Sequence, residues 1–298
     1  QHTMEAVRSL LPELSTALRK GNCGRLGIVG GSTEYAGAPY YAGISALKVG
    51  VDIVHVFTSE DAAPVIKCYS PELIVHPELD PSSWSKRLDV MLVGPGLGRD
   101  ENSMKVAVDT IVEAQRHGRP VVVDSDGLYA FTERWEWLIA APRHHAGLPI
   151  ILTPNAVEMD RLAVKVEGYG SLLIDHFQLR LVASKLAERL KMNIFIKGPT
   201  DMFATTDGKV RLFDREGAPR RPCGLGDCLG GIIAVFLLWS TRKGVDIENV
   251  AAATSFFVRE VARRAFVDTG RGMTASDVIT HVSQLMKNVD EGEKKHEE

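Results

Sequence analysis

The segment CGLGDCLGGIIAVFLL, residues 223–238, places one aspartate among glycines directly before a long apolar run. The apolar run predicts a buried helix, so Asp227 falls where that helix starts. A helix start exposes unpaired backbone N–H groups and the positive end of the helix dipole, and both favour the binding of phosphate. An aspartate there is either an N-cap of the helix or a general base that acts beside a bound phosphate. The residues alone leave both alternatives open.

Two further motifs carry side chains that are suited to chemistry. NAVE, residues 155–158, follows the apolar run LPIILTP, and its Asn155 and Glu158 lie one helical turn apart. They could form a capping box, worth about 1 kcal/mol, or hold a hydrated Mg²⁺ through oxygen ligands. KGPTD, residues 197–201, places Lys197 at the exit of another apolar run, where it could bind phosphate or be a solvated surface group.

Glycine-rich turns follow several of the apolar runs. The loop GAPRRPCGLGD (217–227) adds two arginines that could hold phosphates or simply make a loop soluble. GIVGGSTEYAGAP (27–39) and GPGLGR (94–99) have the same strand-to-turn character. Neither has the GxGxxG spacing of dinucleotide-binding folds, and the chain has no GK[ST] of a P-loop. These departures disfavour an NAD-dependent oxidoreductase and a P-loop enzyme.

Seven short apolar runs alternate with longer amphipathic segments, which predicts parallel strands in a doubly wound sheet with helices on both faces. These runs are 24–31, 52–59, 72–79, 89–96, 120–127, 148–155 and 193–199. Two shorter runs predict a hairpin that turns at Asp207–Gly208. The last third predicts helices over 228–242, 246–266 and 274–287. Ligands of such a sheet bind beyond the carboxyl ends of its strands, where the motifs above fall.

Composition narrows the functional classes. The 298 residues are 45% hydrophobic with a formal net charge of −3, which indicates a globular protein without a basic field for nucleic acid or an anionic membrane. Four cysteines without CxxC spacing indicate neither a disulfide framework nor a zinc site. The longest apolar run, Ile232–Trp239, is far shorter than the roughly 20 residues that span a bilayer.

The chain is expected to form one domain over residues 1–289, followed by a charged, disordered tail over 290–298. It begins at Gln1 and shows no signal-peptide pattern. The four scattered cysteines favour a reducing compartment. The cytoplasm is the first choice, and a mitochondrion after removal of a presequence is the alternative.

The strand-end glycines, the NxxE turn, the KG turn and the GxGD loop together resemble the ribokinase-like superfamily. In their order along the chain, GGSTEYAGAPYYAGISALKVGVDIVHVFT, YSPELIVHP, VGPGLGR, VVVDSDGL, LTPNAVEMDRL, IFIKG and RRPCGLGDCLGGIIA are similar to the ATP-dependent NAD(P)H-hydrate dehydratases. This resemblance covers about residues 4 to 287. It implies a three-layer α/β/α ribokinase-like fold, with a central, mostly parallel sheet and helices on both faces.

The resemblance also implies a reaction. Hydrated NADH or NADPH (NADHX or NADPHX) is phosphorylated by ATP on its ring hydroxyl and then loses phosphate, which restores NAD(P)H and releases ADP. The alternative is a ribokinase-like kinase that stops after phosphorylating a sugar or vitamin alcohol, and a silent nucleotide-binding module is a third hypothesis. ATP as co-substrate, Mg²⁺ as cofactor and small molecules as partners follow from the resemblance, as does the expectation of a homo-oligomer.

Residue roles are implied in the same way. Asp227 is the implied general base, which takes the proton from the substrate hydroxyl. The implied ATP site consists of Lys197, Gly198, Pro199, Thr200, Asp201, Gly217, Ala218, Pro219, Arg220, Arg221, Pro222, Cys223, Gly224, Leu225 and Gly226. The implied substrate site consists of Gly98, Asn155, Ala156, Val157, Glu158, Met159, Asp160, Arg161 and Asp227. Gly30, Gly31 and Ser32 are expected to face the substrate's phosphates, and Mg²⁺ is expected at Asn155 and Glu158 through water.

Overall fold

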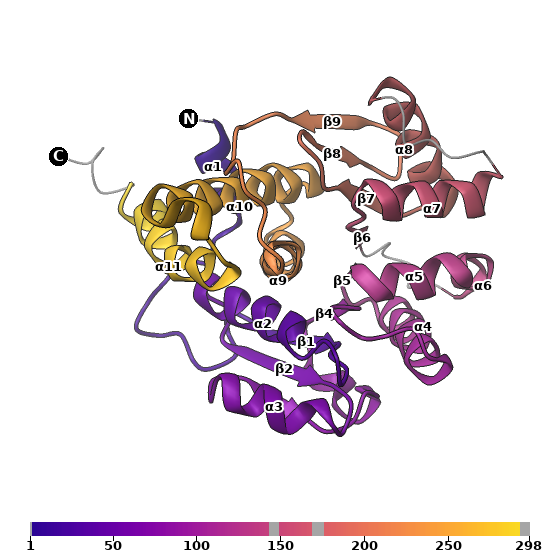
Figure 1. The fold of residues 1–298 in the computed structure, drawn as a ribbon, viewed down its shortest axis with the longest axis horizontal. Helices are drawn as coiled ribbons and strands as arrows, with labels where there is room; N and C mark the ends of the chain where they lie inside the picture. The colour runs from indigo at the N-terminus through magenta and orange to yellow at the C-terminus, as the bar shows by residue number, and fades with distance from the viewer. Residues whose placement is uncertain (1, 143–148, 169–175, 293–298) are drawn as a thin grey trace.

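The computed structural model describes residues 2–142, 149–168 and 176–292. They form a nine-stranded sheet between two layers of helices, with the strand order β3-β2-β1-β4-β5-β6-β7-β8-β9 (Figure 1). Its strands are β1 (Arg25–Val29), β2 (Ile53–Phe57), β3 (Ile74–His76), β4 (Val90–Val93), β5 (Val121–Val123), β6 (Ile150–Leu152), β7 (Asn193–Ile196), β8 (Asp201–Ala204) and β9 (Val210–Phe213).

The pairing of the strands confirms the predicted doubly wound sheet. All neighbours from β3 to β7 pair in parallel, whereas β8 and β9 form an antiparallel hairpin at one edge. Central strands such as β4 and β5 are buried throughout, as expected for Val- and Ile-rich runs that are covered on both faces. The hairpin turns where predicted, because the Gly208 N–H donates to the Thr205 carbonyl at 2.8 Å.

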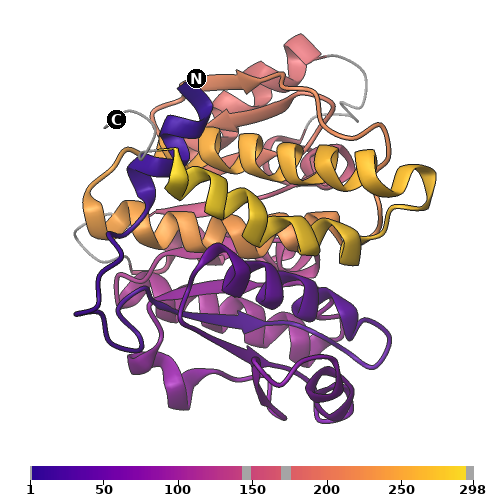
Figure 2. The same ribbon diagram turned by 90° about the vertical axis from the view of Figure 1, so that its left-hand side faces the viewer.

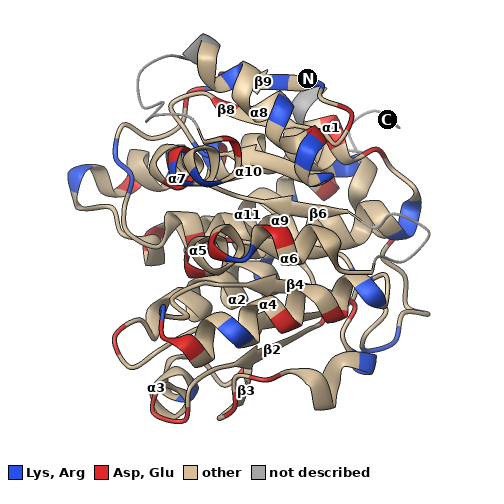
Figure 3. Ribbon diagram, turned by 90° about the vertical axis from the view of Figure 1, so that its right-hand side faces the viewer, with Lys and Arg blue, Asp and Glu red and all other residues tan. Residues whose placement is uncertain are grey.

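Helices cover both faces of the sheet, and each layer has its own apolar core. One face, turned to the viewer in Figure 2, is covered by α1 (His2–Leu10), α2 (Gly37–Val49), α3 (Ala62–Tyr69), α9 (Leu225–Lys243), α10 (Ile247–Thr269) and α11 (Ala275–Glu291). The other face is covered by α4 (Glu101–Arg116), α5 (Ser125–Glu133), α6 (Trp135–Ala140), α7 (Ala156–Glu167) and α8 (His176–Leu190). Figure 3 shows that acidic and basic residues are interspersed over this second layer.

Helix α9 is the most buried of the helices that position the site. Its residues from Cys228 to Ser240 are all buried, and it packs against α2, α10 and the strands β4 and β5. By length and composition alone α9 could cross a membrane, but 72% of its most apolar window lies inside the protein. It is the core helix of this layer, as its apolar sequence predicted.

The ends of the last helices differ slightly from the prediction. Helix α11 begins with a capping box in which Thr274 pairs with Asp277, and it runs to Glu291. The helix thus continues two residues past 289, into the charged segment that was predicted to be a tail. Residues 293–298 of the predicted tail lie outside the described residues.

Candidate active site

Three polar residues follow adjacent parallel strands and meet at the carboxyl edge of the sheet. Asp124 follows β5, Thr153 follows β6 and Lys197 follows β7. The Lys197 ammonium lies 2.6 Å from Asp124 Oδ1, and the Thr153 hydroxyl donates to the same oxygen at 2.8 Å. Asp124 is fully buried, and only 17% of the Lys197 side chain is exposed. The cluster thus joins residues 73 positions apart in the chain.

The first turns of α9 pass over this cluster. The helix begins at Leu225, three residues before the predicted start, because Gly224 adopts the left-handed φ of 93° and serves as N-cap. Asp227 therefore lies in the first turn, and its interpretation as the N-cap is wrong. A Cβ atom at Gly226 would lie 3.7 Å from Lys197 Nζ, and one at Gly230 would lie 3.6 Å from Asp124 Oδ2.

The environment of Asp227 suits a general base. Burial raises the pKa of its carboxyl to about 7, the negative charges of Asp124 and Glu158 act in the same direction, and only Lys197 opposes them. Burial also disfavours the charged form of Lys197, but the surrounding carboxylates outweigh it and raise the pKa of the ammonium. A carboxyl whose pKa lies near neutrality can accept a proton efficiently at physiological pH.

The NAVE turn forms the capping box that the sequence allowed. Asn155 is the N-cap of α7 and accepts the Glu158 N–H at 2.9 Å, while Glu158 Oε2 accepts the Asn155 N–H at 2.8 Å. Burial raises the pKa of the Glu158 carboxyl, and the charges of Lys197 and Asp124 also act on it. This acid therefore belongs to the same electrostatic cluster. Within the described ranges no three His, Cys, Asp or Glu side chains converge into a metal cage.

A cavity of about 780 Å³ opens beside the start of α9. This size suits a nucleotide, since small-molecule sites measure roughly 300–1,000 Å³. Most residues of the implied ATP site line it: Lys197, Gly198, Pro199, Asp201, Gly217, Ala218, Pro219, Arg220, Arg221, Pro222, Leu225 and Gly226. Three residues of that set, Thr200, Cys223 and Gly224, do not line the cavity. Gly224 packs toward Tyr41, and Cys223 is exposed.

The cavity also contains residues that sequence reasoning missed. They are Asp214, Arg215, Glu216, Leu229, Val258, Arg259 and Ala262, together with Asn155 from the predicted substrate site. The guanidinium of Arg259, on α10, donates to the carbonyls of Gly198, Pro199 and Arg215 at 2.8–3.0 Å. It therefore fastens both loops of the cavity wall to α10.

Asp201 holds the same wall from inside. Its buried carboxylate accepts hydrogen bonds from Arg259 and Ser255, each at 2.7 Å, and from the Gly198 N–H at 3.2 Å. Asp201 lines the cavity, as predicted, but its carboxylate is committed to the loop. No local motif could have shown this, because Arg259 and Asp201 are 58 positions apart.

Apart from Asn155 and Asp227, the implied substrate residues lie on the loop after β4 and on helix α7, outside the lining of this cavity. The Gly98 N–H donates to Asp126 Oδ2 at 3.0 Å, and the Arg99 guanidinium pairs with Asp126 Oδ1 at 2.8 Å. The guanidinium groups of Arg99 and Arg161 lie 4.5 and 5.5 Å from the centre of the Tyr129 ring. Two cations thus stand beside Gly98 and the NAVE helix.

The residues of the NAVE helix differ in what they can contact. Ala156 and Val157 are exposed, and Asp160 and Arg161 are half-buried. Met159 is fully buried in the core beneath α7. The prediction that Met159 contacts substrate is wrong for its side chain, which faces the sheet because it lies on the apolar stripe of the helix.

The glycines after β1 have a packing role. A Cβ atom at Gly30 would lie 2.3 Å from the Pro95 carbonyl oxygen, and the Gly31 N–H donates to that oxygen at 2.8 Å. Only glycine lets the loop after β1 approach the loop after β4 so closely. The two loops also bring Ser32 near Gly98, where a Cβ atom would lie 3.9 Å from Ser32 Cβ. A phosphate contact of Gly30, Gly31 and Ser32 stays a prediction.

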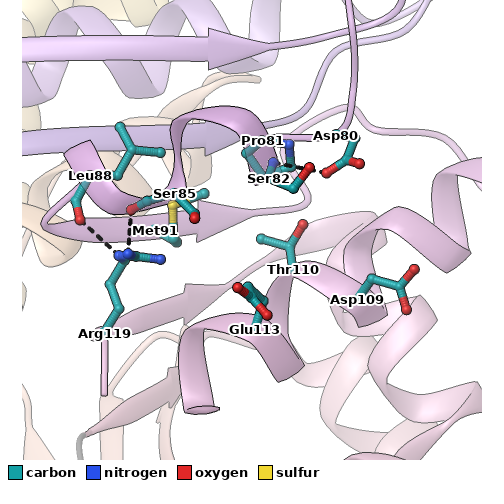
Figure 4. A pocket seen from close by; sticks show the side chains of 10 residues that line it. All are labelled: Asp80, Pro81, Ser82, Ser85, Leu88, Met91, Asp109, Thr110, Glu113 and Arg119. Carbon is teal, nitrogen blue, oxygen red and sulfur yellow. Dashed lines mark hydrogen bonds between the residues drawn. The ribbon is translucent and has the colours of Figure 1, made fainter. Parts of the chain in front are cut away.

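A smaller cavity of about 160 Å³ lies near the amino ends of β4 and β5, opposite the candidate site (Figure 4). Arg119 is its basic residue, and the guanidinium donates to the carbonyls of Leu88, at 2.7 Å, and Ser85. These bonds tie the short helix η1 (Ser82–Arg87) to the segment that leads into β5. Arg119 therefore has a structural role in this cavity, since it joins two backbone segments.

Comparison with known proteins places this geometry in a family. The family model described as NAD(P)H-hydrate dehydratase matches residues 26–284. The chain is 40% identical to the ATP-dependent (S)-NAD(P)H-hydrate dehydratase of Mus musculus, with 95% of this chain and 84% of that protein covered.

Solved structures give the same result at the level of the fold. The ADP/ATP-dependent NAD(P)H-hydrate dehydratase of Bacillus subtilis, co-crystallised with ATP/Mg²⁺, is 25% identical, with a TM-score of 0.73 over 95% of this chain and 97% of that chain. A ribokinase-like superfamily protein of Enterococcus faecalis is 18% identical, with a TM-score of 0.77 over 96% of this chain and 94% of that one. The predicted three-layer ribokinase-like fold is confirmed, and the chain belongs to the NAD(P)H-hydrate dehydratase family.

Proposed function

We propose that the protein uses ATP, with Mg²⁺, to dehydrate hydrated NADH and NADPH back to NAD(P)H. The observation that supports the proposal is the position of Asp227, which follows the cavity-lining Gly226 in the first turn of α9 and has a pKa raised to about 7. Family membership supports the choice of reaction, because the relatives are dehydratases of this kind.

ATP is proposed to lie in the cavity with its phosphates toward the start of α9. The backbone N–H groups of Gly226 and Asp227 in that first turn, the helix dipole and the Lys197 ammonium all favour negative charge there. Arg221 donates to the Gly198 carbonyl at 2.7 Å and Arg220 donates to the Met273 carbonyl at 3.0 Å. The two arginines are therefore proposed to shape the cavity wall as well as to attract the nucleotide.

Asp227 then accepts the proton of the ring hydroxyl. The hydroxyl oxygen forms a bond to the terminal phosphorus of ATP, and the bond from that phosphorus to ADP breaks. The ring C–O bond breaks next: its electron pair leaves with phosphate, the ring nitrogen assists, and the neighbouring carbon loses a proton. The atoms balance as NAD(P)HX plus ATP giving NAD(P)H, ADP and phosphate. ATP is needed because phosphate is a far better leaving group than hydroxide.

The residues present fit a magnesium ion of the kind that phosphotransferases use. Mg²⁺ usually keeps several waters and is bound through one or two carboxylates and the phosphates of a substrate, with no need for an all-protein cage. Glu158 and Asn155 lie at the strand ends and offer oxygen atoms beside Lys197, whose charge couples to Glu158. When bound there, Mg²⁺ would neutralise charge on the phosphates.

The hydrated cofactor is proposed to lie against Gly98 and the exposed face of α7. Arg161 and its neighbour Arg99 supply positive charge for the phosphates of a dinucleotide, and both are held beside Tyr129. The partners proposed are these small molecules, and a second copy of the chain in a homo-oligomer.

A substrate panel tests the proposal against the kinase alternative. The protein is incubated with ATP, Mg²⁺ and either hydrated NADH, hydrated NADPH, or a set of sugar and vitamin alcohols, while ADP and nicotinamide absorbance are both followed. We expect the absorbance of the hydrated nucleotides to return. ADP release with a sugar or vitamin alcohol, and no return of absorbance, would establish the kinase instead.

A further inference from the structure

Asp124 is held more rigidly than a simple helix cap requires. It is the N-cap residue of α5, yet its side chain makes no capping hydrogen bond. Its carboxylate instead accepts hydrogen bonds from Thr153 at 2.8 Å, Lys197 at 2.6 Å and Ser125 at 3.3 Å. Both oxygens of this fully buried carboxylate are therefore bound, Oδ1 by Thr153 and Lys197 and Oδ2 by Ser125.

The backbone beside Asp124 carries strain. Ser125 has a φ of 51°, in the left-handed region that residues with a side chain rarely adopt. Conformations of this kind concentrate at functional sites, where the surrounding structure enforces them. The need to connect β5 to α5 therefore does not by itself account for the strained conformation of the turn at Asp124 and Ser125.

Lys197 reaches Asp124 across an intervening strand. The two residues follow β7 and β5, and Thr153 follows β6 between them. Two spacings between neighbouring strands amount to about 10 Å, so the lysine side chain must extend along the sheet edge. A lysine is ordinarily a flexible point charge. The bond to Asp124 removes that freedom and fixes the ammonium.

The fixed ammonium faces the place where phosphate is proposed to lie. Lys197 and Gly226 both line the cavity, whereas Asp124 does not. A Cβ atom at Gly226 would lie 3.7 Å from Lys197 Nζ, so the glycine leaves space between the ammonium and the helix start. Asp124 therefore contacts Lys197, which lines the cavity, but Asp124 does not line the cavity itself.

We propose that Asp124 is a positioning residue for phosphoryl transfer: it holds the Lys197 ammonium against the first turn of α9, where the transferred phosphoryl group is stabilised. This inference rests on the proposed function and extends it to a residue outside the cavity. A buried ion pair is a weak source of stability, because the desolvation of both charges offsets most of their attraction. It is a strong constraint on geometry, and geometry is what transition-state stabilisation needs.

The first test is Asp124→Asn. The amide keeps the size of the side chain and an oxygen for the Thr153 hydroxyl, and it removes the negative charge that holds Lys197 and that also helps to raise the pKa of Asp227. We expect kcat for the ATP-dependent return of NADPH to fall about 100-fold, as for a catalytic group misplaced by about 1 Å. The KM for ATP and for hydrated NADPH should change less than about threefold. A kcat within about threefold of the unchanged protein would overturn the proposal.

A double-mutant cycle then asks whether Asp124 acts through Lys197. In a Lys197→Met background the lysine is gone, so adding Asp124→Asn should reduce kcat no further. If the second substitution still costs about 100-fold, Asp124 acts by another route and the inference is wrong. Asp89→Asn is the matched control, because it removes an acid at the amino edge that pairs with Arg242 at 3.1 Å. Its kcat should not change.

A second variant and a crystal structure test the inference independently of how Asp124→Asn behaves in the assay. If Asp124→Asn does not fold, Thr153→Val removes one partner of the carboxylate and leaves both charges, and kcat should then fall about 3- to 10-fold with an unchanged KM. If it folds, its crystal structure should show the Lys197 ammonium displaced from its wild-type position, and an unmoved ammonium would reject the proposal. That structure needs no substrate, so it decides the positioning role even if hydrated NADPH is not turned over and the proposed function fails.

Discussion

The two edges of the sheet use charged residues in opposite ways. At the amino edge, Asp52 accepts two backbone N–H groups, Asp89 accepts one, and Arg119 donates to two backbone carbonyls. These side chains join loops to strands. Each charge is satisfied by the main chain, so the amino edge contributes to folding.

At the carboxyl edge the charges face one another. Asp124, Glu158 and Asp227 surround the ammonium of Lys197, and burial with mutual repulsion raises the pKa of Asp227 to about 7. Three acids against one ammonium leave an excess of negative charge around a fully buried aspartate and three partly buried side chains. This excess of negative charge lowers the stability of the fold and raises the pKa of Asp227, which can then act as a base. Unpaired charge, rather than the number of charged residues, therefore distinguishes the functional edge.

The sharpest way to break this comparison is Asp227→Asn. Removal of the base should reduce kcat by about 10²–10⁴-fold, the contribution that general base catalysis usually makes. ATP affinity should persist, because the cavity wall is unchanged, and isothermal titration calorimetry with ATP checks this. A variant that keeps near-normal turnover would remove Asp227 from the mechanism.

The next prediction concerns the cavity wall. Arg259→Gln frees the loops after β7 and β9 from α10, so the KM for ATP should rise about 10-fold in steady-state kinetics. Arg263→Gln is the matched control on the same helix, since Arg263 pairs with Glu260. Equal effects of the two substitutions would show that the loops do not depend on Arg259.

Much of the fold was predictable from local pattern, and the site only in part. Seven apolar runs gave the parallel strands, and the glycines after them marked the carboxyl edge. Asp124 and Arg259 were not found, because the partners that define their roles, Lys197 for Asp124 and the cavity wall for Arg259, are 44 to 73 positions away and no spacing in the chain records them. The start of α9 was placed too late, because Gly224 caps the helix through its backbone conformation and offers no capping side chain.

The pH dependence of stability sharpens the comparison. The pKa of Asp227 is raised from 3.8 to about 7, so the folded protein holds a proton there that the unfolded chain releases near pH 4. Stability therefore falls as pH rises through the window from about 4 to 7. The melting temperature of Asp227→Asn should exceed that of the unchanged protein by at least about 2 °C more at pH 8 than at pH 5. A constant difference across this range would show that the carboxyl is not destabilised by its surroundings.

The smallest effect on activity is expected at the amino edge. Arg119→Met leaves two carbonyls without their donor, so denaturant unfolding should show a loss of about 1–3 kcal/mol. The kcat should stay within about twofold of the unchanged protein, because no group at the carboxyl edge is altered. A tenfold loss of kcat would mean that the two edges are coupled.

The most direct test of the central claim measures ADP and restored NADPH in one reaction that contains ATP, Mg²⁺ and hydrated NADPH. We predict one ADP for each NADPH restored by the unchanged protein, and the loss of both products together in Asp227→Asn. NADPH that returns without ADP, or that returns equally fast with the variant, would contradict the assignment of the carboxyl edge as the site of ATP-dependent dehydration.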